Sequence, residues 1–147
     1  GSVGVIKVGA DSKVELKEKK DRVEDAIYAT KAALQEGIVP GGGVALFDAS
    51  INIDAVNTGE KILLEAILAP FNTILDNAGI EDSKKTGITK GYGIDVTTGK
   101  YVDMIEAGVI DPVLVTKTAL KNAVSVVSTI ISADCVISNT RIDNASS

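Results

Sequence analysis

The stretch Glu36-Gly-Ile-Val-Pro-Gly-Gly-Gly-Val-Ala-Leu46 separates two helical segments and decides how the chain divides. Before it, apolar residues recur at spacings of three and four, which predicts an amphipathic helix from near Leu16 to Glu36. Gly37 favours the end of a helix, and Pro40 cannot continue one. We therefore expect a domain boundary at Gly37–Pro40 and a second helix that begins at Val44.

Outward from this stretch, the pattern predicts a mainly helical fold with a few short strands. We expect a β-type run at residues 3–8, a strand at 92–96 and a last strand at 135–138. One helix is expected to start at a Thr58 cap, bend at Pro70 and end at Gly79, and an apolar helix is expected from Val113 to about Ser132. Loops at 52–57 and 80–91 and a turn at 97–99 connect these elements. Asp111-Pro112 has the residue types of a helix start, with Asp111 as the N-cap. Because the helix after it is apolar nearly all round, we expect it at the buried centre of a helical bundle.

Three parts follow from this division of the chain. Residues 1–37 supply a strand and a half-polar helix that cannot bury itself, residues 38–138 form a helical domain with its own core, and residues 139–147 are a polar tail. The chain begins with Gly-Ser rather than Met, so we expect it to be a piece of a longer protein.

Composition excludes several classes of function. The chain has no His, which removes imidazole bases, His metal ligands and the Ser-His-Asp triad. A single Cys, Cys135, cannot form an internal disulfide or a Cys-rich zinc site, and it is expected to be a small buried hydrophobe. The net charge of −5 and the few aromatic residues argue against nucleic-acid binding. We expect no membrane association, because serines and threonines interrupt the apolar run after Val113.

Taken by themselves, the candidate functional residues favour structural roles. Gly41-Gly42-Gly43 could admit a ligand to the backbone, but a flexible loop explains a bare glycine triplet better. Asp25 reads as a surface acid, with Arg22 as a possible partner. Asp95 reads as a turn acid and Asp111 as an N-cap with one oxygen left free.

Three sequence blocks, taken in order, resemble one family. They are Lys17-Glu-Lys-Lys-Asp-Arg-Val-Glu-Asp-Ala26, the stretch Glu36–Leu46 and Tyr101-Val-Asp-Met-Ile-Glu-Ala-Gly-Val-Ile-Asp-Pro112. Their order and spacing resemble the C-terminal part of the group I chaperonins (the GroEL/Hsp60 family), over about residues 3 to 138.

The resemblance implies a subunit of an ATP-driven folding machine that works in seven-membered, usually double, rings. This chain would supply part of the intermediate domain and the C-terminal half of the equatorial domain. ATP or ADP with Mg²⁺ would be the cofactor, with the metal ligands in the missing N-terminal half, in the family's Asp-Gly-Thr-Thr-Thr motif. Other subunits, unfolded clients and a co-chaperonin would be the partners. The cytoplasm of a bacterium or the matrix of an organelle would be the location.

The resemblance also implies roles for single residues, at the positions where this sequence matches the family's motifs. Asp25 occupies the place of the catalytic acid that orients the attacking water. The nucleotide-contacting positions are Gly42 with Gly41 beside it at the sugar, Asp95, Val96 and Thr97 at the adenine, and Asp111 at the ribose. This reading reverses the structural interpretation of Asp25 and Gly42.

The sequence also departs from the family pattern. Position 95 is Asp where the best-known members have Asn, the loop at 80–91 looks shorter, and the C-terminus lacks a Gly-Gly-Met tail. Two other hypotheses remain open. One is a stand-alone helical interaction domain without nucleotide chemistry, and the other is a small hydrolase that uses Asp25 and Asp111 as a carboxylate pair.

Overall fold

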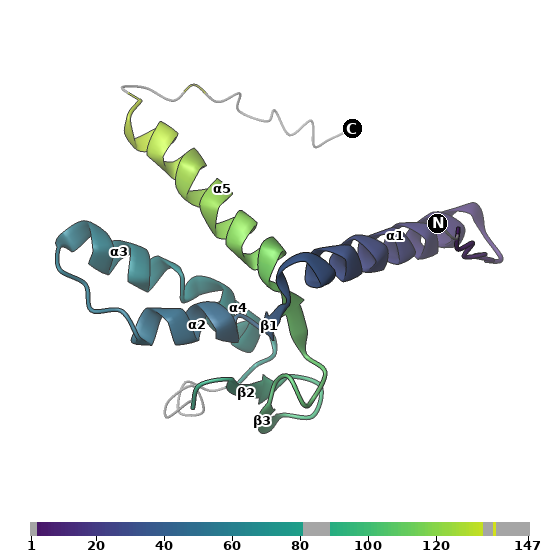
Figure 1. The fold of residues 1–147 in the computed structure, drawn as a ribbon, viewed down its shortest axis with the longest axis horizontal. Coiled ribbons are helices and arrows are strands. Elements are labelled where there is room, and N and C mark those ends of the chain that lie inside the picture. The colour runs from purple at the N-terminus through teal and green to yellow at the C-terminus, as the bar shows by residue number, and fades with distance from the viewer. Residues whose placement is uncertain (1–2, 81–88, 134–136, 138–147) are drawn as a thin grey trace, which may run out of the picture.

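A computed structural model describes residues 3–80, 89–133 and 137 of the chain. The structure is mainly helical with four short strands among these residues (Figure 1). In chain order the elements are α1 (Lys13–Glu36), β1 (Ile38–Pro40), α2 (Val44–Ile51), α3 (Thr58–Ala66), α4 (Ala69–Asn77), β2 (Tyr92–Asp95), β3 (Lys100–Asp103), β4 (Ile110–Pro112) and α5 (Val113–Ile131).

Strands β1 and β4 pair in antiparallel register and form the junction of the molecule. Val39 lies opposite Asp111, and Pro40 lies opposite Ile110. Helix α1 leads into β1 and α5 leaves β4, so both long helices diverge from this two-stranded ladder (Figure 1). The carbonyl of Gly37 also accepts a hydrogen bond from the Val113 N–H, at 3.1 Å. The junction therefore fixes the end of one helix against the start of the other.

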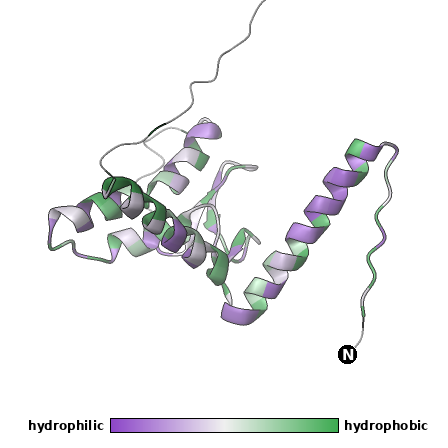
Figure 2. Ribbon diagram, turned by 90° about the horizontal axis from the view of Figure 1, so that it is seen from above, coloured by the Kyte–Doolittle hydropathy of each residue, from purple (hydrophilic) through white to green (hydrophobic). Residues whose placement is uncertain are grey.

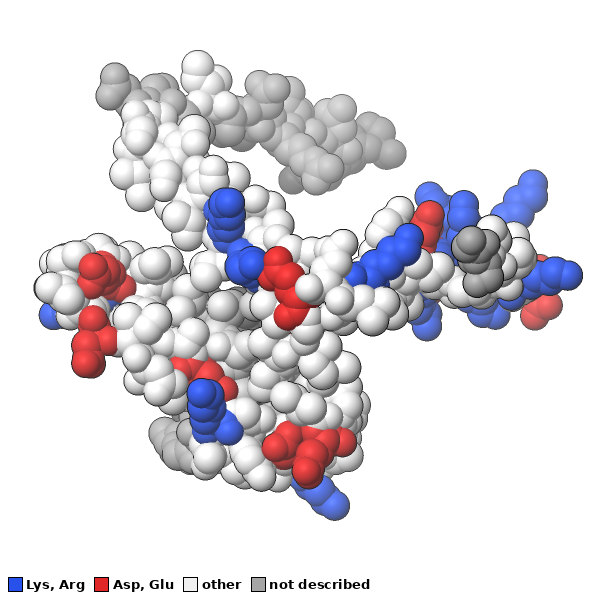
Figure 3. All heavy atoms as spheres, in the orientation of Figure 1, with Lys and Arg blue, Asp and Glu red and all other residues white. Residues whose placement is uncertain are grey.

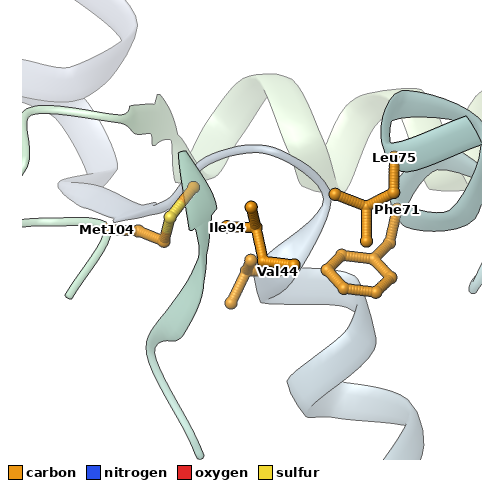
Figure 4. Packing of buried hydrophobic residues seen from close by; sticks show 5 residues of the cluster. All are labelled: Val44, Phe71, Leu75, Ile94 and Met104. Atoms are coloured by element: carbon orange, nitrogen blue, oxygen red, sulfur yellow. The ribbon is translucent and has the colours of Figure 1, made fainter. Parts of the chain in front are cut away.

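A small apolar cluster forms the core beside the junction. It consists of Val44, Phe71, Leu75, Ile94 and Met104, contributed by α2, α4, β2 and the residue after β3 (Figure 4). Each of these side chains is less than one-tenth exposed. This cluster joins helices α2 and α4 to the β2–β3 hairpin, and neither α1 nor α5 contributes a residue to it.

Helix α1 is a polar arm. Ser12 caps its N-terminus by accepting a hydrogen bond from the Glu15 N–H, and Gly37 at φ 85° ends it as the sequence predicts. Of its 24 residues only Ala32 is buried. Figure 2 shows the helix next to the N label largely in the hydrophilic colour, with paler and greener turns toward its other end. Its charged first half contains two ion pairs at i, i+4 spacing, Glu15–Lys19 and Glu18–Arg22, each of which stabilises a helix by about 0.2–0.5 kcal/mol.

Three local expectations are wrong in detail. The run at residues 3–8 forms no strand, since no described segment pairs with it, and Val3 and Val5 stay exposed. The cap of α3 is Asn57, whose side chain accepts from the Glu60 N–H, and not Thr58. Pro70 does more than bend one helix, because α3 ends at Ala66 and Pro70 lies in the first turn of a separate helix, α4.

The expectations for Asp111 and for the last helix also need correction. Asp111 belongs to β4, the N-cap position of α5 falls on Pro112, and no side chain caps this helix. Helix α5 has the predicted extent, but no residue in it is buried. The expected strand at 135–138 and the tail at 139–147 lie outside the described residues, apart from residue 137, as does most of the loop at 80–91.

Candidate functional site

The triple-glycine bend is a tight crossing of the chain rather than a loose loop. Gly41 donates its N–H to the Val109 carbonyl at 2.8 Å, which continues the ladder between β1 and β4. Gly42 and Gly43 have φ values of 66° and 78°, in the left-handed region that glycine enters without strain. A Cβ on Gly43 would lie 2.6 Å from the backbone nitrogen of Phe71. The bend therefore needs glycine at this position so that α2 can cross α4.

Asp111 lies beside this bend because the β1–β4 register places it opposite Val39. Its side chain is partly buried, and no described residue forms a hydrogen bond or ion pair with its carboxylate. Burial raises the pKa of this carboxyl above the ordinary value for Asp, because desolvation disfavours the charged form. An unpaired acceptor beside partly buried glycine backbone is suited to the hydroxyls of a ligand.

Gly42, Gly43 and Asp111 share the lining of a cleft of about 830 Å³. One wall is made by α2, α3 and α4 and the other by α5, with residues such as Ile62, Leu63, Ala119 and Val127 facing the space. The lining is almost wholly apolar away from the junction. The cleft thus has a polar rim at the bend and an apolar body between the helices.

Helix α5 forms the exposed wall of this cleft. By length and composition it is long and apolar enough to cross a membrane, so its serines and threonines do not interrupt the apolar run as far as the sequence analysis expects. A single helix of this kind is weak evidence for a membrane span, since core helices of other proteins pass the same test. Because α5 already lines a cleft together with α2, α3 and α4, burial against other protein segments explains its apolar surface better than a membrane does.

The three adenine-site candidates lie together on the turn after β2. The side chain of Asp95 accepts hydrogen bonds from the Thr97 N–H at 2.9 Å, from the Thr97 hydroxyl and from the Thr98 hydroxyl at 2.8 Å. Mainly the Thr97 hydroxyl, with help from Thr98, holds the pKa of Asp95 below its ordinary value. The carboxylate is committed to its own turn, as the turn interpretation predicts, so Val96 and the turn backbone are the groups left for a ligand.

Asp25 is placed apart from the other candidates. It is exposed on α1 and does not line the cleft. It lies 12 residues before Gly37, about 18 Å along the helix axis. The suggested pairing with Arg22 is wrong, because Arg22 pairs with Glu18 at 2.6 Å. In this conformation Asp25 and Asp111 do not share a cleft, which argues against the two-carboxylate hydrolase.

The sequence analysis missed one buried carboxylate. Asp48 in α2 is 8% exposed, and it links this helix to the segment that begins β2. A signal was available in the sequence, since Asp48 lies four residues after Val44 on what should be one face of the helix.

The described residues thus bring Gly41, Gly42 and Asp111 together, place Asp95–Thr97 on a neighbouring hairpin and leave Asp25 on a separate arm. No group of three or more metal-ligating side chains occurs among them.

Comparison with known proteins identifies the family of the chain. One solved structure, titled "Crystal structure of group III chaperonin in the open state", matches this chain with a TM-score of 0.74 and 27% sequence identity. The match covers 88% of this chain but only 30% of that chain. The mainly helical fold expected from the sequence is confirmed. Residues 1–141 match the TCP-1/cpn60 chaperonin family, so the chain belongs to the TCP-1/cpn60 chaperonin family.

Proposed function

We propose that the protein to which this chain belongs is an ATP-driven folding chaperonin, and that this chain carries part of its nucleotide site. The observation that supports the proposal best is the junction. Pairing of β1 with β4 places the triple-glycine bend next to the unpaired, partly buried carboxylate of Asp111. Glycine backbone beside a free carboxylate acceptor is suited to the hydroxyls of a nucleotide sugar.

Each candidate then has a distinct role. Gly42, with the buried Gly41 beside it, presents backbone to the nucleotide sugar, and Asp111 accepts hydrogen bonds from the ribose hydroxyls. The turn that includes Val96 and Thr97 contacts the adenine. Asp95 holds that turn through Thr97 and Thr98 instead of reading the base itself.

Asp25 is the proposed catalytic acid. Phosphoryl transfer depends more on positioning and charge stabilisation than on a strong base, so an ordinary carboxylate can orient the attacking water. Asp25 has no partner among the described residues and is carried on a polar arm that meets the junction at Gly37. Closure of that arm over the nucleotide would deliver it, in the manner of other enzymes that complete their site by domain closure.

The remaining parts of the proposal concern protein outside this chain. ATP or ADP binds with Mg²⁺, whose ligands belong to another part of the subunit. The partners are other subunits of a ring, expected to be sevenfold and double, together with unfolded clients and a co-chaperonin. We expect neither nucleic acid nor membrane among them, and a location in the bacterial cytoplasm or an organelle matrix.

The decisive experiment measures ATP hydrolysis by the full-length protein and by its Asp25→Ala variant. We expect kcat to fall by about 10²-fold or more, because the attacking water loses its orienting group. Asp21→Ala is the matched control, since Asp21 is also exposed and lies one turn earlier on α1, and its kcat should not change. Equal loss in both variants would refute the role of Asp25.

The exposed apolar helix α5 favours a second candidate, an interaction domain without nucleotide chemistry. ATP titration separates the two functions. Binding by the full-length protein supports the chaperonin site, and failure of the full-length protein to bind ATP supports the interaction domain. The isolated chain should not hydrolyse ATP under either hypothesis, because much of the phosphate site is absent from it.

A further inference from the structure

Asp48 is the buried carboxylate that the proposed site does not yet use. Its Oδ2 atom accepts a hydrogen bond from the Gly91 N–H at 2.8 Å, across 43 positions of sequence. Its Oδ1 atom is buried and has no hydrogen-bond partner among the described residues. A buried carboxylate with a single contact is costly to fold, so its presence needs an explanation.

The contact of Asp48 has a geometric counterpart one helical turn away. Val44 and Asp48 lie on one face of α2, about 6 Å apart along the axis. Gly91 lies in the turn just before β2, and Gly93 lies two residues further on, within β2. Val44 packs so closely on Gly93 that a Cβ there would lie 2.7 Å from Val44 Cγ2. The segment from Gly91 to Gly93 is therefore held against α2 at two points, by Asp48 at Gly91 and by Val44 at Gly93.

Two different segments of the proposed nucleotide site meet through this pairing. Helix α2 begins at the triple-glycine bend, directly after Gly43. Strand β2 ends at Asp95, where the turn Asp95–Thr97 begins. Figure 4 shows Val44 lying close to Ile94, next to the start of α2. Any shift of β2 along α2 would therefore move the base-contacting turn relative to the sugar-contacting bend.

We propose that Asp48 is a positioning residue for the nucleotide site, which fixes the turn Asp95–Thr97 relative to the triple-glycine bend by holding Gly91. This inference rests on the proposed nucleotide-binding function. A charged acceptor suits the task because its hydrogen bond to a backbone N–H is stronger than a neutral one. The core cluster also holds these elements together, through Val44, Ile94 and Met104, so we expect variants at position 48 to fold.

The test is steady-state ATP hydrolysis and ATP binding by the full-length protein with substitutions at position 48. In Asp48→Ala we expect KM for ATP to rise about tenfold while kcat stays within about twofold of the wild type, because the base and sugar contacts lose their register. Asp48→Asn should restore KM to near the wild-type value, since its amide oxygen still accepts from Gly91. Asp48→Leu fills the same space without an acceptor and should behave like Asp48→Ala, which covers the case that the smaller side chain impairs folding.

Ser50→Ala is the matched control. Ser50 is as buried as Asp48, but its hydroxyl donates only to the Phe47 carbonyl within the same helix. We expect KM to stay unchanged in this variant. Hydrogen exchange at the Gly91 amide should accelerate in Asp48→Ala and Asp48→Leu and remain slow in Asp48→Asn and Ser50→Ala.

The outcomes distinguish this inference from the proposed function. If the wild-type protein binds ATP and KM is unchanged in both Asp48→Ala and Asp48→Leu, the positioning role is refuted and the nucleotide site stands. A parallel fall of kcat in all four variants would indicate a structural role only. If the wild-type protein does not bind ATP, the proposed function itself fails, whatever the exchange rate at Gly91.

Discussion

Helices α1 and α5 diverge from the same junction and are both largely exposed, but the exposed surface of α1 is polar and that of α5 is apolar. Helix α1 begins with a charged half whose ion pairs include Glu15–Lys19 and Glu18–Arg22. Helix α5 has only Lys117 and Lys121 as charged residues, and its valines and isoleucines stand half exposed or more along much of its length. Figure 3 shows this contrast, with blue and red spheres crowded over α1 and few over α5.

The difference shows that an exposed helix in this chain need not be a helix that remains exposed in the whole protein. A polar helix can project into solvent at little cost, whereas contiguous apolar surface marks a place that other protein covers. The matched chaperonin structure is more than three times as long as the part this chain matches, since the match covers 30% of it. We therefore interpret α1 as a helix that stays in solvent. We interpret α5 as a core helix that is buried by segments outside this chain.

A charge placed in the cleft wall should give the largest effect. We expect Val127→Asp to destabilise the full-length protein by about 3 kcal/mol or more, because the carboxylate would be buried without a partner. In this chain alone the same change should cost within about 0.5 kcal/mol, as for an ordinary surface substitution. Urea unfolding of both proteins measures the two values.

Val14→Asp is the control for that prediction. Val14 lies on α1 and is 81% exposed, so its replacement should leave both proteins within about 0.5 kcal/mol of the wild type. If Val127→Asp were equally harmless in the full-length protein, the distinction between the two helices would be lost.

An intermediate effect is expected where α2 crosses α4 to form the other wall of the cleft. Gly43→Ala should destabilise this chain by about 2–4 kcal/mol, because the new Cβ meets the Phe71 backbone and the φ of 78° is unfavourable for alanine. Gly79→Ala separates the two causes, since Gly79 has a φ of 68° and open space around it, and should cost about 1 kcal/mol. Equal losses in denaturant unfolding would mean that the crossing contributes nothing.

The smallest effect is expected at the contact between the two long helices. Glu36 pairs with Lys117 at 2.5 Å, and both side chains are partly exposed. Glu36→Gln should cost at most about 1 kcal/mol, as is typical of exposed ion pairs. Its clearer signature should be a broader distribution of distances between spin labels on α1 and α5. Glu18→Gln breaks a pair inside α1 and should leave that distribution unchanged, so identical broadening in both variants would exclude a role for the Glu36 pair.

Much of the local structure could be predicted from the sequence. The periodic apolar residues and Gly37 indicate α1 and its end, and the alternation before Thr97 indicates β2. These features depend on neighbours within about four residues, and this is the range over which propensity and capping operate. The same reasoning failed for residues 3–8, because a strand exists only where a partner strand lies beside it.

Less of the candidate site could be predicted in the same way. The resemblance to chaperonins supplied Gly42 and Asp111, and the structure places them side by side through the β1–β4 register. Local reasoning misassigned Asp111 as a helix cap, because Asp before Pro is also compatible with the end of a strand. The spacing of Asp48 from Val44 could indicate burial, but its contact could not be predicted, because its partner, Gly91, lies 43 positions away.

The sequence by itself determined the long helix α1 with its end at Gly37, the extent of α5 and the family, because short-range patterns and the order of the sequence blocks can be read directly from the chain. Only the tertiary structure decided that Gly43 must lack a side chain, that Asp48 holds Gly91 and that α5 stands uncovered. The physical reason is that close packing and burial depend on which distant segments meet, and a linear pattern does not record those meetings.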